Sequence, residues 1–189
     1  MNKQSEIVKR LTDRELLLNV YLTQLMILSI SIGLSWLLFN DWLAVFQLIK
    51  WNVNHALIGL AGGLFVVILE IILIKVLPSD WFDDGGINDR IFKRISPIHI
   101  AILSLTVAFC EELLFRGVLQ TSFGIVIASI IFAVIHFRYM HKLFLFTFTI
   151  ILSFFLGGIY YYTNNLLPVI IAHFLIDFIL GLLIRYRIL

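Results

Sequence analysis

Six apolar stretches of this chain are long enough, or nearly long enough, to cross a lipid bilayer as α-helices. A hydrocarbon core about 30 Å thick requires about 20 helical residues at about 1.5 Å each. The predicted spans are Leu16–Phe39, Ala56–Leu77, Ile98–Leu119, Ser122–Phe137, Leu143–Tyr161 and Leu166–Ile184. Only 14% of the 189 residues are charged and 61% are hydrophobic, whereas soluble domains carry about 25% charged residues. The sequence therefore predicts an all-α polytopic membrane protein with about six transmembrane helices.

Lysine and arginine are unevenly distributed over the segments that connect these spans. Eleven of the fourteen fall on one side, in the N-terminus, the loops at 78–97 and 138–142, and the C-terminus. Lys50 alone falls on the other side, and Lys75 and Arg116 lie within spans. Because basic loops stay in the cytoplasm, we expect a multi-pass protein of the cell membrane with both termini cytoplasmic. An even number of spans agrees with this arrangement.

The chain is expected to form one structural unit with two parts. An N-terminal region, 1–97, contains two transmembrane helices and interfacial loops, and a core, 98–184, contains four helices. No basic stripe suited to nucleic acid is present, so nucleic-acid binding is excluded and the lipid bilayer is the expected partner. The single cysteine, Cys110, cannot form an internal disulfide and is interpreted as a core residue.

Two adjacent acids and an arginine lie within the third span, in the string CEELLFRG. Ionisable groups at the bilayer centre cost at least about 2.5 kcal/mol each, so such groups indicate function. Glu112 and Arg116 are four residues apart and share a helix face, which predicts a structural ion pair. Glu111 points about 100° away and is expected to face a cavity. The two acids should therefore have different roles.

Polar residues of the fourth and sixth spans are expected at the depth of these acids. If the third and fourth spans form a hairpin with its tip at Gly124, His136 lies level with Glu112, about 18 Å below the tip. His173 and Asp177 share a face of the sixth span, about 10 and 16 Å below the same surface. The sequence predicts a single site composed of Glu111, His136, His173 and Asp177.

Two imidazoles and two carboxylates are suited to two kinds of hydrolysis. A buried carboxylate beside a histidine can take a proton from water, which then attacks an amide carbonyl. The same four residues could instead bind one divalent metal such as zinc, which would acidify its bound water. The cofactor requirement is thus either none or one divalent metal. No serine or cysteine is spaced with a base as a covalent nucleophile would be.

Three motifs occur in order, each within a span. Glu111–Arg116 resembles EExxxR, Phe132–His136 resembles FxxxH, and His173–Asp177 resembles HxxxN/D. These are the motifs of the CPBP intramembrane proteases, the CAAX protease and bacteriocin-processing family, also called Abi. That family comprises type II CAAX prenyl endopeptidases and bacterial relatives linked to bacteriocin processing and immunity. The resemblance covers about Ile98–Ile184, which would make this part the family's protease core.

The resemblance implies a role for each motif residue. Glu111 would be the catalytic base acting with His136, whose motif includes Phe132, while Glu112 and Arg116 would form a structural clamp. His173 and Asp177 would bind the substrate carbonyl and stabilise the oxyanion. Asp177 stands where many members have asparagine, and an ionised aspartate repels an oxyanion. Asp177 must therefore be protonated, orient His173, or bind a metal.

The function expected is an intramembrane endopeptidase acting on a protein or peptide substrate. A catalytically silent membrane regulator or bacteriocin-immunity factor that retains the fold is the main alternative, and it would function without Glu111. A metal or ion transporter is less favoured because the chain lacks a second matching set of broken helices. Glu70, in the second span, fits no motif and is interpreted as a helix-contact or cavity residue. The substrate classes that this function allows are a prenylated CaaX protein, a leader peptide and a signalling protein.

Overall fold

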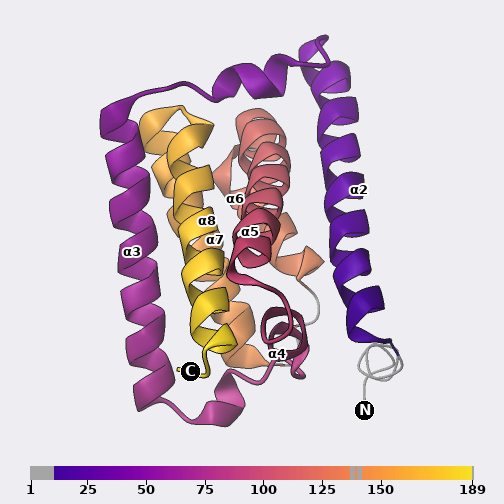
Figure 1. Ribbon diagram of the computed structural model, residues 1–189. Helices are drawn as coiled ribbons and strands as arrows, with labels where there is room; N and C mark the ends of the chain where they lie inside the picture. The colour runs from indigo at the N-terminus through magenta and orange to yellow at the C-terminus, as the bar shows by residue number, and fades with distance from the viewer. Residues whose placement is uncertain (1–10, 137–138, 140–141, 189) are drawn as a thin grey trace.

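The computed structural model describes residues 11–136, 139 and 142–188, and in these residues all the regular structure is helical (Figure 1). The long helices are α2 (Asp13–Phe39), α3 (Val53–Val76), α5 (Pro97–Glu112), α6 (Thr121–Ile135), α7 (Leu143–Thr163) and α8 (Leu166–Arg185). Shorter elements are α4 (Ile87–Phe92), the 3₁₀ turns η1 (Ala44–Leu48) and η2 (Ser79–Trp81), and a π-helix, η3 (Leu113–Gln120). The predicted all-α polytopic membrane fold is confirmed.

The third and fourth predicted spans form one continuous helical stretch, so five helical stretches in the described residues are long and apolar enough to cross a membrane. The third, Pro97–Ile135, contains α5, η3 and α6. It bends at Gly124, where φ is 83° and ψ is 167°, a conformation that glycine adopts without a Cβ clash. The arm after the bend, 125–135, is about 16 Å long at about 1.5 Å per residue. It is a short return arm rather than a full span, because the hydrocarbon core is about 30 Å thick.

Side chains that cap the helix N-termini set where several helices begin. Thr12 and Glu15 form a reciprocal capping box at the start of α2, and Asn52 accepts a hydrogen bond from the amide of His55 at the start of α3. Ser96 caps α5, whose first residue, Pro97, has no amide hydrogen to satisfy. The first two helices therefore begin three residues before the apolar runs that predicted them, since polar caps lie outside those runs.

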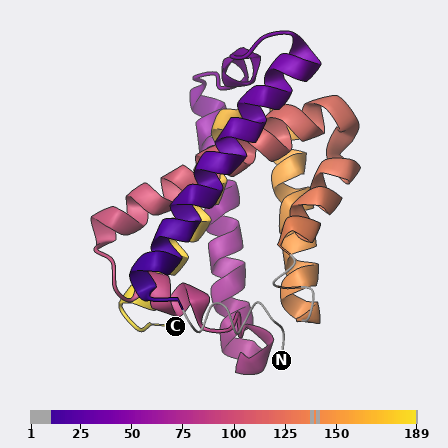
Figure 2. The same cartoon turned by 90° about the vertical axis from the view of Figure 1, so that its right-hand side faces the viewer.

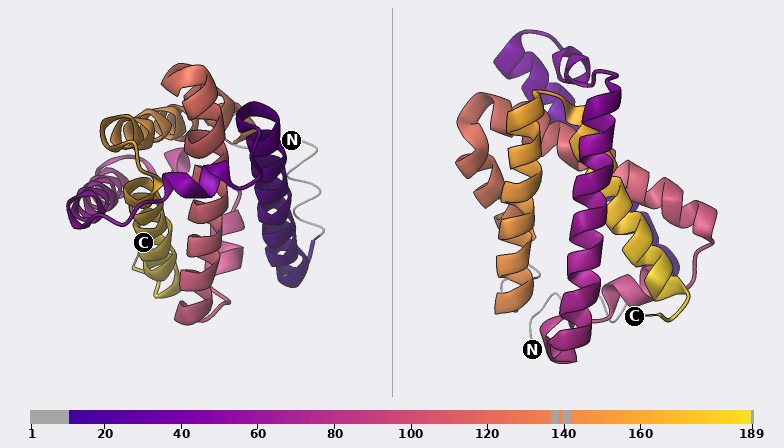
Figure 3. Two further views of the ribbon diagram at one scale, coloured as in Figure 1. Left: turned by 90° about the horizontal axis from the view of Figure 1, so that it is seen from above. Right: turned by 90° about the vertical axis from the view of Figure 1, so that its left-hand side faces the viewer.

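The two helices of the N-terminal region lie on opposite edges of the bundle (Figure 1). Helix α2 packs against α5 and η3, and α3 packs along α8. Helices α5 and α8 run obliquely to α3 and α7 (Figures 2 and 3), so their central turns meet inside the bundle. Large apolar side chains on the outer faces of α2 and α3 are exposed, including Leu25 and Phe65. This is the pattern of helices that face lipid, since lipid tails solvate apolar side chains.

Both ends of the described chain lie at the same end of the bundle (Figure 1). Arg90 and Arg94 pair with Asp13 at distances of 2.8 and 2.9 Å, and Arg185 donates to the carbonyl of Lys93. These contacts join the start of α2, the region of α4 and the end of α8. The basic residues Lys3, Lys9, Arg10 and Arg138, which contribute to the predicted orientation, lie outside the described residues. That this end faces the cytoplasm remains a prediction.

Replacing Gly59 by alanine should destabilise the contact between α3 and α8. A Cβ at Gly59 would lie 2.3 Å from the carbonyl oxygen of Pro168, which is backbone and cannot rotate away. We expect a loss of about 1 to 3 kcal/mol, visible as a lower thermal midpoint of the detergent-solubilised protein. Gly33→Ala is the matched control, because nothing lies within 4 Å of its added Cβ. Equal midpoints for the two variants would contradict the close packing of α3 on α8.

Candidate active site

One cavity, of about 530 Å³, contains the predicted site. Five of the long helices contribute polar side chains to its lining: Gln24 from α2, Glu70 from α3, Ser104 and Glu111 from α5, Thr149 from α7, and His173 and Asp177 from α8. The cavity is also lined by Phe132 of α6, by His136 directly after α6, by Asp84, and by Asn88 and Asp89 of α4. The structure therefore brings together the four residues that the sequence singled out, Glu111, His136, His173 and Asp177.

Glu112 and Arg116 form a fully buried ion pair beside this cavity. The Nε of Arg116 lies 3.2 Å from Oε2 of Glu112, and its Nη1 donates to Oε1 at 3.3 Å. The Nη2 group donates to the carbonyl and hydroxyl oxygens of Ser153 in α7, at 3.0 and 3.1 Å. The guanidinium also lies over the ring of Phe132, 4.8 Å from its centre. Arg116 thus joins three helical segments, which supports the clamp role implied by the resemblance.

Arg116 lies on η3, the π-helix that follows the two glutamates. A π-helix is wider than an α-helix and forms hydrogen bonds between residues five apart, and it often occurs at functional sites. The amide of Thr121 is bonded to the carbonyl of Arg116, and the Thr121 hydroxyl donates to the same carbonyl at 3.1 Å. This widened turn changes the rotation of all later residues relative to α5, so an ideal α-helix predicts the faces of this stretch only up to Glu112.

His173 connects the buried ion pair to the cavity. Its Nδ1 lies 2.7 Å from Oε1 of Glu112, and its Nε2 lies 3.6 Å from Oδ2 of Asp177. Because a carboxylate accepts hydrogen bonds, Nδ1 carries the hydrogen toward Glu112. Glu112 therefore contacts His173 as well as Arg116, a contact that the sequence did not predict. Asp177 therefore lies beside the second ring nitrogen of His173.

The ring of His136 is held at the end of α6 by its own helix. Its Nδ1 lies 2.8 Å from the carbonyl oxygen of Phe132, and the two rings are 4.5 Å apart. A carbonyl can only accept, so Nδ1 carries the hydrogen and Nε2 of the neutral ring is a hydrogen-bond acceptor. The ring therefore has one acceptor nitrogen, and it lines a cavity that Glu111 also lines.

Glu111 has a partner that motif spacing did not reveal. Its side chain is 7% exposed, and its Oε1 accepts a hydrogen bond from the Nε2 of Gln24 in α2 at 3.1 Å. The expectation that Glu111 faces a cavity agrees with the structure, but the carboxylate has this amide as a neighbour. A mid-span glutamine is the one signal in the sequence that could have pointed to the contact.

Glu70 lines the same cavity from α3, which agrees with its interpretation as a cavity residue. Its Oε2 is buried and has no hydrogen-bond partner among the described residues. Cys110 is buried within an apolar cluster that includes Leu114 and Phe132, which agrees with its interpretation as a core residue.

The sequence left open that Glu111, His136, His173 and Asp177 together bind one divalent metal. Among the described residues, no three histidine, cysteine, aspartate or glutamate side chains lie in a group that could hold a metal ion. Both ring nitrogens of His173 face carboxylates, and Nδ1 of His136 is bonded to backbone. The conformation described therefore does not fit a metal bound jointly by Glu111, His136, His173 and Asp177.

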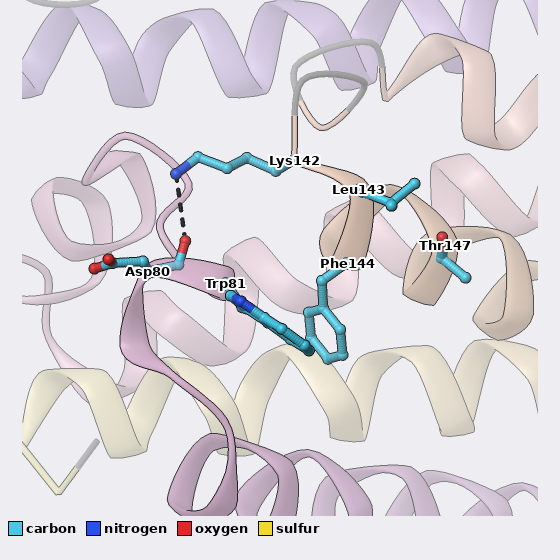
Figure 4. A pocket seen from close by; sticks show the side chains of 6 residues that line it. All are labelled: Asp80, Trp81, Lys142, Leu143, Phe144 and Thr147. Carbon is cyan, nitrogen blue, oxygen red and sulfur yellow. Dashed lines mark hydrogen bonds between the residues drawn. The ribbon is translucent and has the colours of Figure 1, made fainter.

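A second hollow, of about 510 Å³, lies between η2 and the start of α7 (Figure 4). Trp81 and Phe144 pack there with ring centres 5.5 Å apart. Lys142 donates to the carbonyl of Asp80 at 3.3 Å and to the carboxylate of Asp83 at 3.1 Å. The hydrogen bond from the backbone N–H of Gly85 is the main cause that lowers the pKa of Asp83, and the hydrogen bond from Lys142 lowers it further. The six side chains drawn in Figure 4 include none of the predicted catalytic residues.

Comparison with known proteins agrees with the three motifs. The model of the family described as type II CAAX prenyl endopeptidase Rce1-like matches residues 93–179. The chain is also 40% identical over 169 residues to the uncharacterized protein YpbD of Bacillus subtilis (strain 168), covering 88% of each chain. No solved structure matches the chain. The chain belongs to the Rce1-like family of type II CAAX prenyl endopeptidases.

Proposed function

We propose that this protein is an intramembrane endopeptidase that hydrolyses a peptide bond inside the cavity between its helices. The observation that carries the proposal is the convergence of Glu111, His136, His173 and Asp177 on one cavity, from three separate helical segments. A protein that only needed buried ion pairs for stability would not require a base, two histidines and a second acid around a hollow space. Membership of the Rce1-like family supports the same chemistry.

In the proposed reaction, Glu111 and His136 bind and activate one water molecule. The water oxygen attacks the amide carbonyl carbon while the Glu111 carboxylate takes a proton from it, and the carbonyl electron pair moves to oxygen. Breakdown of the tetrahedral intermediate breaks the C–N bond, and the proton passes to the leaving amine through Glu111 or His136. The products are a new carboxyl terminus and a new amino terminus.

His173 is proposed to stabilise the oxyanion. With Glu112 holding Nδ1–H and Asp177 beside Nε2, the ring can carry hydrogens on both nitrogens, and Nε2–H is then a donor into the cavity. Glu112 in turn is held by Arg116. In this account the clamp serves catalysis by fixing the direction of His173, and Asp177 acts through His173 instead of meeting the oxyanion itself.

The test uses the purified protein in liposomes and a short peptide with a prenylated cysteine followed by three C-terminal residues. The family description makes this substrate class the first to examine. We expect mass spectrometry to show release of the tripeptide by the wild-type protein and none by Glu111→Gln. Equal release by both proteins would overturn the assignment of Glu111.

Chelation should leave the proposed reaction intact. Because the described site residues do not form a three-ligand group, we propose that Glu111 and His136 activate water without a resident metal. Treatment with 1,10-phenanthroline should change the cleavage rate less than about twofold, which is roughly the reproducibility of such assays. Loss of a general base would lower the rate about 10²-fold or more, a much larger change. Loss of activity on chelation, with recovery on adding zinc, would instead show that the ligands rearrange around a metal.

A further inference from the structure

Helix α2 contributes one polar side chain to the active-site cavity, although it lies outside the residues 93–179 that the family model matches. This side chain is Gln24, which is 4% exposed. Its amide nitrogen donates to Oε1 of Glu111 at 3.1 Å, between residues 87 positions apart in the chain. The contact is buried and joins α2 directly to the proposed base.

Tyr21 of α2 contacts His99 of α5, and Gln24 likewise reaches another helix, which distinguishes it from four other polar side chains of α2. Asn19, Thr23, Ser29 and Ser31 each donate to the backbone carbonyl four residues earlier in their own helix. Gln24 alone among these five uses its side chain to reach another helix. Hydrogen bonds within one helix satisfy polar groups in an apolar environment, whereas the bond from Gln24 constrains the direction of a carboxylate.

The amide oxygen of Gln24 provides a second observation. Oε1 is buried and has no hydrogen-bond partner among the described residues, and Gln24 lines the same cavity as Glu111. A buried acceptor without a partner is costly, and ordered water in a polar cavity is the usual partner. The oxygen is thus suited to accept a hydrogen bond from water beside Glu111.

We propose that Gln24 is a positioning residue for the catalytic carboxylate. Its N–H group holds Oε1 of Glu111 and leaves Oε2 to act on water. Its amide oxygen helps to retain that water near the carboxylate. The catalytic consequence rests on the proposed function, but the effect of Gln24 on the Glu111 carboxylate does not.

The chain provides a matched control in Gln120. This second buried glutamine donates from Nε2 to the carbonyl of Gly157 at 2.8 Å, and its Oε1 also has no partner among the described residues. It is not among the residues that line the cavity. The variants Gln24→Met and Gln120→Met therefore remove the same groups from similar environments, and only the first removes a hydrogen bond to Glu111.

The test measures how readily Glu111 reacts with dicyclohexylcarbodiimide, which modifies protonated carboxyl groups in apolar surroundings. The detergent-solubilised full chain is labelled at one fixed pH, and fragment-ion mass spectrometry separates Glu111 from Glu112. Because the hydrogen bond from Gln24 holds Oε1 of Glu111 and must break before that oxygen reacts, its loss in Gln24→Met should raise the labelling rate of Glu111 about 10-fold. Gln120→Met should leave this rate unchanged.

The other charged groups around Glu111 are the same in all these proteins, so they do not contribute to the difference. They are Glu70 of α3, Glu112 and Arg116, which follow Glu111 in the chain, His136 after α6, and His173 and Asp177 of α8. An unchanged labelling rate in Gln24→Met, or an equal rise in Gln120→Met, would overturn the proposal. If Gln24→Met fails to fold, Gln24→Asn, which keeps the amide on a side chain one methylene shorter, replaces it with the same expected rise.

A kinetic measurement separates this inference from the proposed function. With a peptide that the wild-type protein cleaves, Gln24→Met should lower kcat about 10-fold and leave KM within about twofold, since substrate contacts are kept. If the wild-type protein cleaves no peptide, the proposed function fails, while the labelling result still decides whether Gln24 positions Glu111. A change in KM alone would assign Gln24 to substrate binding and overturn the positioning role.

Discussion

Replacement of Glu111 by glutamine is expected to lower peptide cleavage by about 10²- to 10⁴-fold, the range attributed to a positioned general base. Glutamine keeps the size of the side chain and can still hydrogen bond to Gln24, but it cannot accept a proton from water. The protein should still insert and fold, because the buried ion pair of Glu112 with Arg116 is untouched. Initial cleavage rates at equal amounts of folded protein measure the effect.

Two further variants test whether the loss of activity is specific to the proposed catalytic residues. His136→Ala should also lose most of its activity, because it removes the base at the end of α6. Glu70→Gln changes another carboxyl of the same cavity to the same amide, and it should lower the rate far less than Glu111→Gln does. If Glu70→Gln abolished cleavage while Glu111→Gln kept it, the roles assigned to the two acids would be wrong.

Replacement of Arg116 by methionine is expected to cause the largest loss of stability. The side chain is 1% exposed, and its removal leaves Glu112 buried without its cation and Ser153 without its donor. Breaking one partner of a buried ion pair costs about 3 to 5 kcal/mol. Little folded protein should be recovered in detergent, as judged by size-exclusion profiles and thermal denaturation.

The control for Arg116 is the same substitution in an exposed ion pair. Arg94 pairs with Asp13 but its side chain is 74% exposed, and exposed pairs contribute about 0 to 1 kcal/mol. Arg94→Met should therefore behave like the wild-type protein. The double variant Glu112→Gln with Arg116→Met also removes the unpaired carboxylate of Glu112 and should recover part of the lost stability. A fully folded Arg116→Met protein would contradict the clamp.

The sequence predicted four of the helices closely, because long apolar runs specify membrane helices almost by themselves. Leu16–Phe39 and Leu166–Ile184 correspond to Asp13–Phe39 and Leu166–Arg185. Hydropathy could not show that the return arm after Gly124 is too short to span, since its apolar run continues that of the preceding helix. The bend depends on one glycine conformation, which hydropathy does not report.

The ion pair of Glu112 with Arg116 could be predicted because the two residues are four positions apart in one chain segment. Contacts between helices depend on how each helix is rotated about its own axis relative to its neighbours. The bond from His173 to Glu112 and the bond from Gln24 to Glu111 are both of this kind. Spacing along one chain segment contains no information about them.

The most direct test of the account is a comparison of membrane and secreted peptides from a host strain that lacks this protein and is complemented with either wild type or Glu111→Gln. We expect specific cleavage fragments with the wild-type protein that are absent with Glu111→Gln, at equal amounts of inserted protein. Identical peptide profiles, together with full complementation by Glu111→Gln, would contradict the protease assignment and establish a role as a non-catalytic membrane regulator.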